Sequence, residues 1–395
     1  MSVNTMDFNQ IATVLADITS QVTGTQAIAA TNTSDWISQA QVALKAGYEP
    51  VLNAISQIIS KTIYSMRPYN RKFNGLKVDS QRFGAITRKL VVADKPFEDD
   101  KQFQLVDGQS IDHYVVNKPQ VLETRFYGFN TVMKTLTIFK DQLDSAFQSP
   151  TALGELMSMV TQNVQDMIEQ EHESMARMTL AGLAGGIQAS VTAGVRDANN
   201  IVHLLTEYNQ LSGQNLSATD VYQAANFKPF MQFVYSRVAA LSQLMTERSS
   251  LFQTKITGYN INRHTPVSDQ LVYLYAPARY QFEMMAIADT FHDSYLTMAE
   301  TESVNFWQSI TTPDTINVDP SYIDNTGAVV DTTGVTVSPL FGIIADRDAL
   351  GYTVVNEWNA VSPLNIAGGY WNSAWHLQQK YWIDLSEKAL LLVLD

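Results

Sequence analysis

The chain has 395 residues, of which 45% are hydrophobic and 16% are charged, a composition typical of a globular protein rather than a disordered or membrane-spanning one. It contains no cysteine, which excludes disulfides, thiolate zinc sites and cysteine nucleophiles. Its formal net charge of −13 argues against a protein that coats nucleic acid over its whole surface, because phosphate contacts require lysine and arginine. No membrane span or secretory signal is recognisable, so we expect a protein that folds in a cytoplasm without a membrane partner.

The first 66 residues carry helical patterns. Apolar residues from Phe8 to Val22 recur with a 3.6-residue period, which predicts a first helix. A second helix is expected from about Ser34, with Ser34 and Asp35 as candidate N-caps. Loose polar links separate these helices, so the pattern is equally consistent with an arm that buries its apolar stripes against a partner and with a domain of its own.

The segment from Lys61 to Val92 inverts the charge of the chain. It contains eight basic residues and a single acidic one, Asp79. Such a run is either a solvated surface or a site attracted to an acidic neighbour, which would be another copy of this chain or nucleic acid. The candidate subunit contacts in this basic run are Lys61, Arg67, Arg71, Lys72, Arg88 and Lys89.

Residues 84–140 change to the alternation typical of strands. The segments KQFQLV and QSIDHYVV flank Asp107-Gly108, a dipeptide that favours the tight turn of a β-hairpin. The flanks are too polar to cover a core of their own, so we expect the hairpin to project from the body. Its candidate subunit contacts are Asp99, Asp100, Asp107 and Gly108. A second strand pair is expected within residues 122–139.

A long helix is predicted from Pro150 to about Ala184. Ser149 is its expected N-cap, and Gly185-Gly186 is expected to end it. Such a helix would be about 50 Å long. Glu171 falls within its apolar stripe, where a lone buried carboxylate would be costly. We therefore expect an Arg or Lys partner for Glu171, including one from another copy of the chain.

The same helix carries Glu169 and His172 with the Glu-x-x-His spacing of di-iron bundles. A di-iron site requires a second such pair, and no other histidine has a glutamate three residues before it. A solvated acidic helix face, with His172 beside it, is the favoured interpretation. Phosphate-binding loops and nucleophile motifs are also missing from the sequence, so we assign no metal ligand, no cofactor and no catalytic residue.

Mixed helix and strand patterns follow a soft polar stretch at residues 186–226. Helices are predicted over residues 229–245 and 279–291, and strands over 271–277, 340–344 and 389–395. Asn325-Thr326-Gly327 predicts a turn within a Thr/Asp/Val-rich stretch. The aromatic cluster near the end of the chain is expected in the core or in a subunit contact rather than in base stacking; it comprises Tyr370, Trp371, Trp375, His376, Tyr381 and Trp382.

This order of elements resembles the major capsid (head) proteins of tailed double-stranded DNA bacteriophages, which have the Hong Kong 97-type fold. In residues 126–186 the resemblance is carried by an aromatic strand, the polar turn KDQLDSAF and the long helix with its acidic middle. In residues 341–395 it is carried by FGIIADRDALG, the aromatic strand beginning GGYWNSAW and the closing strand ALLLVLD. Both stretches are closest in pattern to the capsid proteins of short-tailed phages.

The resemblance implies an α+β subunit of the Hong Kong 97-like fold that self-assembles into hexamers and pentamers. These would form an icosahedral head shell around phage double-stranded DNA, without enzymatic activity or cofactors. The implied domains are an N-terminal arm (1–83), an extended loop (84–122), a peripheral domain (123–190, with the long helix at 150–184), an axial domain (191–365) and C-terminal strands that return to the body (366–395). Scaffolding and portal proteins are implied partners, packaged DNA is contacted non-specifically, and the virion is assembled in the host cytoplasm.

Two alternatives remain open at this point. An encapsulin-like compartment shell would have the same fold but would enclose a cargo protein. A metal-dependent enzyme of unrecognised class would use the acidic helix face or the aromatic cluster. Both shell-forming proteins should produce large particles in electron micrographs, whereas the enzyme should be a small soluble oligomer.

Overall fold

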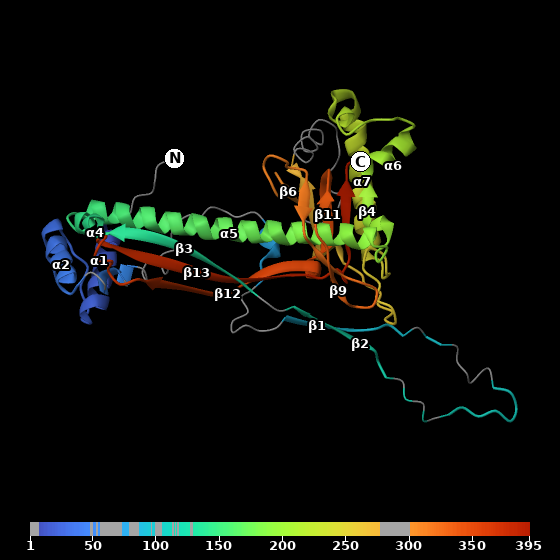
Figure 1. Cartoon of the computed structure of the whole chain (residues 1–395), viewed down its shortest axis with the longest axis horizontal. Coiled ribbons are helices and arrows are strands. Elements are labelled where there is room, and N and C mark those ends of the chain that lie inside the picture. The colour runs from blue at the N-terminus through green and yellow to red at the C-terminus, as the bar shows by residue number, and fades with distance from the viewer. Residues whose placement is uncertain are drawn as a thin grey trace.

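The computed structural model describes residues 8–47, 50–52, 54–55, 73–78, 87–95, 97–98, 105–112, 114, 116, 118–126, 129–276 and 301–395. The predicted helix at residues 279–291 lies outside these ranges. The molecule is elongated, with one long helix running through it, small helices at one end, and a sheet with further helices at the other (Figure 1). A loop projects from the body on the side opposite those further helices. None of the described helices is both long and apolar enough to cross a bilayer.

The long helix α5 spans Pro150–Thr192 and connects the two ends of the molecule. Ser149 caps it as predicted, since its Oγ accepts a 3.2 Å hydrogen bond from the Ala152 N–H. The predicted end at Ala184 is wrong, because the helix continues through Gly185-Gly186. A Cβ on Gly185 would lie 2.4 Å from Cγ2 of Val318, so the residue is needed for close packing rather than for a chain break.

A three-stranded antiparallel sheet, here called the long sheet, lies along α5 (Figure 1). Its strand order is β12 (Leu350–Val361), β13 (Tyr370–Ile383) and β3 (Asn130–Phe139). β12 falls in the range expected for the axial domain, yet its partner is β13. The expected strand pair within residues 122–139 is wrong, because β3 pairs with β13 and the preceding strand pairs elsewhere.

A five-stranded sheet, here called the body sheet, forms the second unit. Its order is β4 (Ile201–His203), β14 (Ala389–Val393), β11 (Leu340–Asp346), β5 (Gln270–Tyr275) and β6 (Thr301–Val304). Every residue of β11 and β14 is buried, which confirms these two predicted strands. Alternate residues explain the burial, because Ile343 and Leu391 face α5 whereas Ile344 and Leu390 face α6 (Leu204–Ser212) and α7 (Ala224–Thr246).

The Thr/Asp/Val-rich stretch forms two small hairpin-like sheets beside α5. β7 (Ile316–Val318) pairs with β10 (Val335–Val337), and β8 (Ser321–Ile323) pairs with β9 (Val329–Asp331). Gly327 has φ +87° at the predicted turn. The side chain of Asp324 accepts the backbone N–H groups of Thr326 and Ala328, so the turn prediction is confirmed.

The two described helices of the N-terminal arm pack onto their own chain. α1 (Phe8–Thr23) and α2 (Thr33–Lys45) contact each other, and α1 also contacts the N-terminal half of α5. Leu15 of α1 and Trp36 of α2 are fully buried there. The N-cap of α2 is Asn32 and not Ser34 or Asp35, since its Oδ1 accepts the Asp35 N–H at 2.9 Å. These helices therefore need no second copy to bury their apolar stripes.

Candidate assembly surfaces

A ribbon of two strands carries the projecting loop (Figure 1). β1 (Thr87–Val92) pairs antiparallel with β2 (Val121–Phe126), and we call residues 93–120 between them the extended loop. Asp107 and Gly108 form the predicted turn, with Gly108 at φ +85°. The described residues 105–112 on either side of this turn are not in strands. Among the residues that the structure describes, strand pairing is therefore found only at the base of the hairpin.

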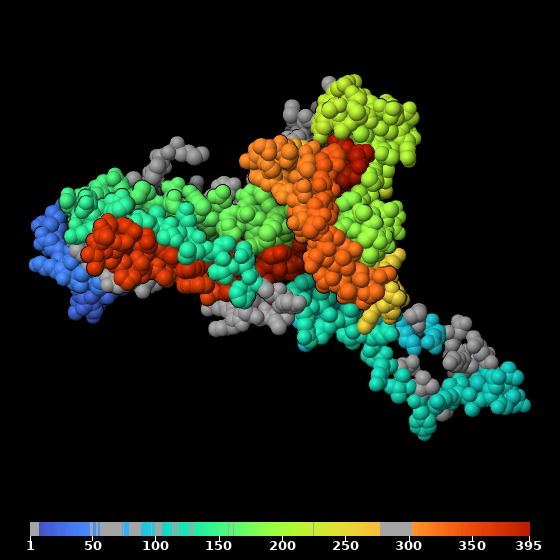
Figure 2. Space-filling model, in the orientation of Figure 1, coloured from blue at the N-terminus to red at the C-terminus, as the bar shows by residue number. Residues whose placement is uncertain are grey.

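The extended loop exposes large apolar side chains to solvent. Phe97 is 106% exposed, Tyr114 is 89% exposed and Val116 is 76% exposed. Figure 2 shows this loop standing away from the body. Burying one such side chain contributes roughly 1.5–3 kcal/mol, and gathered exposed apolar groups mark contact sites for other proteins. The loop therefore has the surface of a protein-binding element.

The candidate contact residues of the basic run have different surroundings. Arg88 is exposed, and its Nε lies 3.8 Å from Oε1 of Glu123, which leaves its guanidinium open to a neighbour. Lys89 differs from the sequence-based expectation, because its partners belong to its own chain. The remaining candidates lie outside the described residues: Lys61, Arg67, Arg71, Lys72, Asp99 and Asp100.

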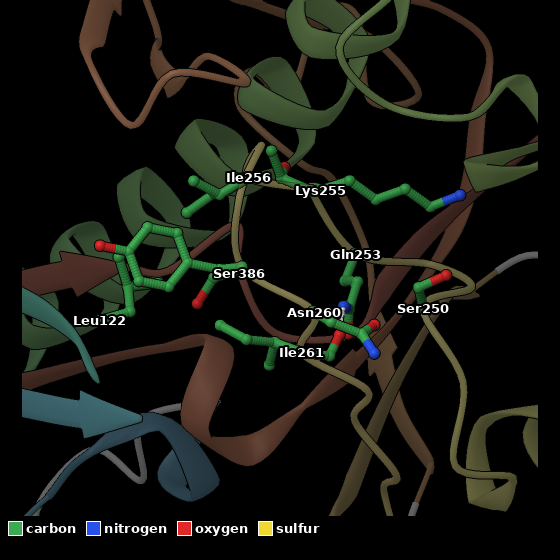
Figure 3. A pocket seen from close by; sticks show the side chains of 10 residues that line it. Leu122, Ser250, Gln253, Lys255, Ile256, Asn260, Ile261 and Ser386 are labelled. Carbon is green, nitrogen blue, oxygen red and sulfur yellow. Dashed lines mark hydrogen bonds between the residues drawn. The ribbon is translucent and has the colours of Figure 1, made fainter. Parts of the chain in front are cut away.

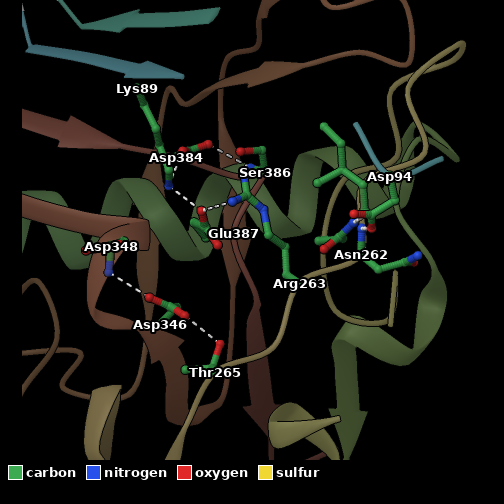
Figure 4. Close-up of polar contacts among 12 residues, drawn as sticks. Lys89, Asp94, Asn262, Arg263, Thr265, Asp346, Asp348, Asp384, Ser386 and Glu387 are labelled. Carbon is green, nitrogen blue, oxygen red and sulfur yellow. Dashed lines mark hydrogen bonds and ion pairs between the residues drawn. The ribbon is translucent and has the colours of Figure 1, made fainter. Parts of the chain in front are cut away.

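A charged cluster joins the ribbon to the body (Figure 4). Nζ of Lys89 lies 3.0 Å from Oδ2 of Asp384 and also contacts Glu387, on the turn between β13 and β14. Nη1 of Arg263 lies 2.9 Å from Oε1 of Glu387. Burial acts to lower the pKa of Lys89, but the two carboxylates more than offset this effect and hold the pKa above its ordinary value. Lys89 is therefore charged and paired at neutral pH.

Asp94 makes a second connection between the ribbon and the body (Figure 4). Its Oδ2 accepts the Asn262 N–H at 3.0 Å, and its own N–H donates to the Asn260 carbonyl at 2.6 Å. Its carboxylate also pairs with Arg248. Because the sheet of β1 and β2 has only these two strands, no strand pairing with the long sheet or the body sheet holds the ribbon in place.

A small polar cavity lies next to the ribbon (Figure 3). It has a volume of about 160 Å³ and is lined by Leu122 of β2, by residues of the segment 250–261 and by Ser386. Pockets that bind drug-sized ligands usually measure about 300–1,000 Å³. The cavity is therefore too small for such a ligand, and we assign it no cofactor.

Glu171 lines a groove of about 120 Å³ between α5 and the long sheet. Most of the lining is apolar, including Met133, Met167 and Trp375, while Glu357 supplies a second carboxylate. Glu171 is half-buried rather than fully buried. No ion pair reaches it from elsewhere in the described part of the chain, so the expected cationic partner is not found within the described chain.

The sequence matches the family described as Phi29-like phage major capsid protein over residues 11–393. The chain belongs to this family. It is a capsid protein that forms the shell of a phage virion, as the resemblance of residues 126–186 and 341–395 implied. The family match disfavours both alternatives considered from the sequence. No curated protein sequence matches the chain significantly.

One solved phage structure shows the same fold at low sequence identity, and others resemble it less closely. A chain in the structure of the head fibre and inner core protein gp22 of native bacteriophage P68 is 14% identical, with a TM-score of 0.54, 83% of this chain covered and 85% of that chain. A chain in the capsid structure of Staphylococcus phage Andhra is 12% identical, with a TM-score of 0.49 and coverage of 84% and 86%. The α+β, Hong Kong 97-like fold class is confirmed.

The acidic middle of α5 in the capsid protein is not an open polar face. His172 is buried, and its ring centroid lies 5.9 Å from that of Tyr352 in β12. Glu173 pairs with Arg177 one turn later, at 2.6 Å. The expectation that His172 borders a solvated face is wrong, because β12 covers this side of α5. Within the described residues, no three His, Asp or Glu side chains are close enough to hold a metal ion.

A buried arginine ties three segments of the capsid protein together. Nη2 of Arg196 donates to the Ala389 carbonyl at 2.8 Å and to the Phe252 carbonyl, and Nε donates to Oδ1 of Asn200 at 2.8 Å. Burial lowers the pKa of Arg196 to about 9, an effect that the charge of Asp384 only partly offsets. The side chain therefore depends on these hydrogen bonds to remain charged inside the protein.

We expect Arg196→Lys to lower the free energy of unfolding by about 1–3 kcal/mol. A lysine ammonium cannot reproduce the planar fork that reaches several carbonyl groups at once. Chemical denaturation followed by tryptophan fluorescence measures the loss. Arg237→Lys is the matched control, because Arg237 forms a half-exposed pair with Glu207 and should lose less than about 1 kcal/mol. Equal losses in the two variants would contradict the role of Arg196.

Proposed function

We propose that copies of this capsid protein assemble into hexamers and pentamers that form an icosahedral head shell around phage double-stranded DNA. Family membership supports this proposal, and so does the extended loop, whose exposed apolar residues require a partner. Scaffolding and portal proteins are the proposed assembly partners, and packaged DNA is contacted non-specifically. Assembly takes place in the host cytoplasm, and the proposal assigns no catalytic step to the chain.

The proposed domains follow the expected division with one change. The proposed divisions are residues 1–83 as the N-terminal arm, residues 84–122 as the region of β1, the extended loop and the start of β2, and residues 123–190 as the peripheral domain with the rest of β2 and most of α5. Within the axial range 191–365, β12 is reassigned to the peripheral domain, because it pairs with β13 along α5. In the C-terminal range 366–395, β13 joins the long sheet and β14 joins the body sheet.

The groove at Glu171 is the proposed seat for the extended loop of a neighbouring copy. Tyr114, Val116 and Lys118 are exposed and each two residues apart, the spacing that places side chains on one side of an extended chain. Their face combines two apolar groups with a cation. The groove offers apolar walls, the carboxylates of Glu171 and Glu357 and one cation, Lys134, so its carboxylates outnumber its lysine. This complementarity of charge and polarity supports Lys118 as the cationic partner of Glu171.

Glu171→Gln is expected to reduce shell assembly several-fold while leaving the isolated subunit intact. The substitution removes one negative charge from the groove and changes the free energy of unfolding of the subunit by less than about 0.5 kcal/mol. Sedimentation velocity measures the fraction of protein in shells. Glu155→Gln serves as the control, because Glu155 is an exposed residue of the same helix. Normal assembly of the Glu171→Gln protein would refute the proposed seat.

Particle size and nucleic-acid content in a native preparation test the proposed function directly. Electron micrographs should show closed shells, and nuclease-protected double-stranded DNA should be recovered from them. Shells that contain a protein cargo and no DNA would support an encapsulin-like compartment instead. A small soluble oligomer that never forms shells, even with a scaffolding partner, would overturn the proposal.

A further inference from the structure

We propose that Lys89, Arg263, Asp384 and Glu387 form a charge latch that sets the angle between the ribbon and the body, and thereby the curvature of the shell. This inference rests on the proposed function, because the angle matters only if the extended loop reaches a neighbouring copy. Lys89 and Arg263 act as positioning residues. They act through their ion pairs within the chain, by directing the loop.

The ribbon depends on side chains for its direction. β1 and β2 pair only with each other, so the hydrogen-bond ladder of a larger sheet does not fix their orientation. The described contacts that anchor them are the latch at Lys89 and the backbone and carboxylate contacts of Asp94. Both polar anchors lie on the β1 side of the ribbon (Figure 4), whereas on β2 Leu122 lines the cavity against the body, so loss of one polar anchor leaves the direction of the ribbon less strictly fixed.

The latch is strong because its carboxylates are buried. The side chains of Asp384 and Glu387 are 0% and 6% exposed, so neither can exchange its cation for water without a large loss. Asp384 also accepts the Ser386 N–H at 2.9 Å, which fixes the turn that carries both acids. Arg263 pairs with Glu387 and not with Asp384. Removing the charge of Lys89 would therefore leave Asp384 without an ion-pair partner among the described residues.

Because the latch lies at the base of the loop, a small rotation there produces a large displacement of the exposed side chains of the loop. The loop extends well beyond the ribbon (Figure 1), and its residues Phe97, Tyr114 and Val116 are exposed. A rotation at Lys89 displaces these side chains in proportion to their distance from it. The angle between neighbouring copies follows the direction in which the loop leaves, so one latch angle corresponds to one preferred shell curvature.

Lys89→Met, which keeps the length of the side chain but removes its charge, tests the latch. The expected result is shells with a broad distribution of diameters in electron micrographs, in place of a single size. In the unassembled protein, hydrogen exchange of the β1 and β2 amides should become about tenfold faster. Lys89→Arg should restore both the single diameter and the slow exchange, since a guanidinium also pairs with two carboxylates.

Arg125→Met is the matched control, because Arg125 is an exposed cation of the paired strand β2 and its partner Glu123 lies outside the latch. It should leave both the shell diameter and the exchange rates unchanged. Lys89→Gln, which also removes the charge from the latch, should broaden the diameters in the same way and keeps the test valid should Lys89→Met fail to fold. Lys89→Met or Lys89→Gln shells of the wild-type diameter would overturn the latch while leaving the proposed function intact. A wild-type protein that forms no shells would instead refute the proposed function, and the exchange measurement would still decide whether the latch exists.

Discussion

A capsid protein that lacks residues 96–118 is expected to fold normally and to form no closed shells. The deletion removes the exposed apolar residues Phe97, Tyr114 and Val116, together with Lys118. A stable protein interface buries about 1,600 Å² in total, and the described apolar residues of the loop are exposed on the isolated subunit. Without the loop, neighbouring copies lose most of the area that would hold them together.

The subunit should tolerate this deletion because β1 and β2 stay paired with each other up to the point where the loop is removed. Val92 faces Val121, and the Ala93 N–H donates to the Gln120 carbonyl at 2.8 Å, so Lys95 and Pro119 can be joined through a short glycine linker. Asp94 and the latch are retained. The unfolding temperature should fall by no more than about 4 °C, as a change below 1 kcal/mol would give.

Electron micrographs of the deleted protein, expressed with the proposed scaffolding partner, measure the effect. A full-length variant with Tyr114→Ser and Val116→Ser serves as the comparison, because it keeps the length of the loop but loses two apolar contacts. We expect this variant to assemble in reduced yield. Closed particles formed by the deleted protein would show that the loop is dispensable.

Trp371→Ala is expected to cost about 3–5 kcal/mol in the free energy of unfolding. Trp371 is 1% exposed and lies in the core shared by β13, the N-terminal half of α5 and the arm helices α1 and α2. Removing the indole leaves a cavity at the point where these elements meet. The arm helices cannot close this cavity without disturbing the packing of Leu15 of α1 and Trp36 of α2 in the same core. The arm should consequently detach before the body sheet unfolds.

Trp358→Ala is the matched control for this substitution. Trp358 lies on the neighbouring strand β12, where it is 41% exposed and stacks on His376 with ring centroids 4.8 Å apart. Its loss should cost less than about 1.5 kcal/mol. Thermal and urea unfolding of both proteins measures the difference, and limited proteolysis of the arm reports its detachment. A Trp371→Ala protein as stable as the control would mean that the arm does not contribute to this core.

The local signals of the sequence predicted individual elements well. Ser149 followed by Pro150 marks the start of α5, and the apolar runs of β11 and β14 mark buried strands, because each signal depends on a few consecutive residues. The end of α5 could not be predicted in this way. Gly185 is required by Val318, a residue far along the chain, and only the folded structure brings the two together.

The contact residues also fall into two groups: those marked by a local sequence signal and those paired over a long sequence separation. The turn at Asp107-Gly108 follows from the φ preference of glycine, whereas Lys89 and Asp384 are 295 residues apart and nothing in a single sequence pairs them. Asp94, Arg263 and the two acids of the latch were not singled out. One signal was present, because Asp384 and Glu387 lie in the short turn between β13 and the apolar strand β14. Acids that are buried in such a turn require cationic partners. The pairing within residues 122–139 failed for the same reason, because strand partners are chosen over long distances.

The position of β14 has a consequence for synthesis on the ribosome. This strand lies between β4 and β11, near the middle of the body sheet, although it is translated after both of them. Until it emerges, nascent chains expose the unpaired edges of β4 and β11 and cannot complete the core that receives Leu391. Subunits released early by a premature stop therefore remain unfinished, which keeps defective copies out of the growing particle.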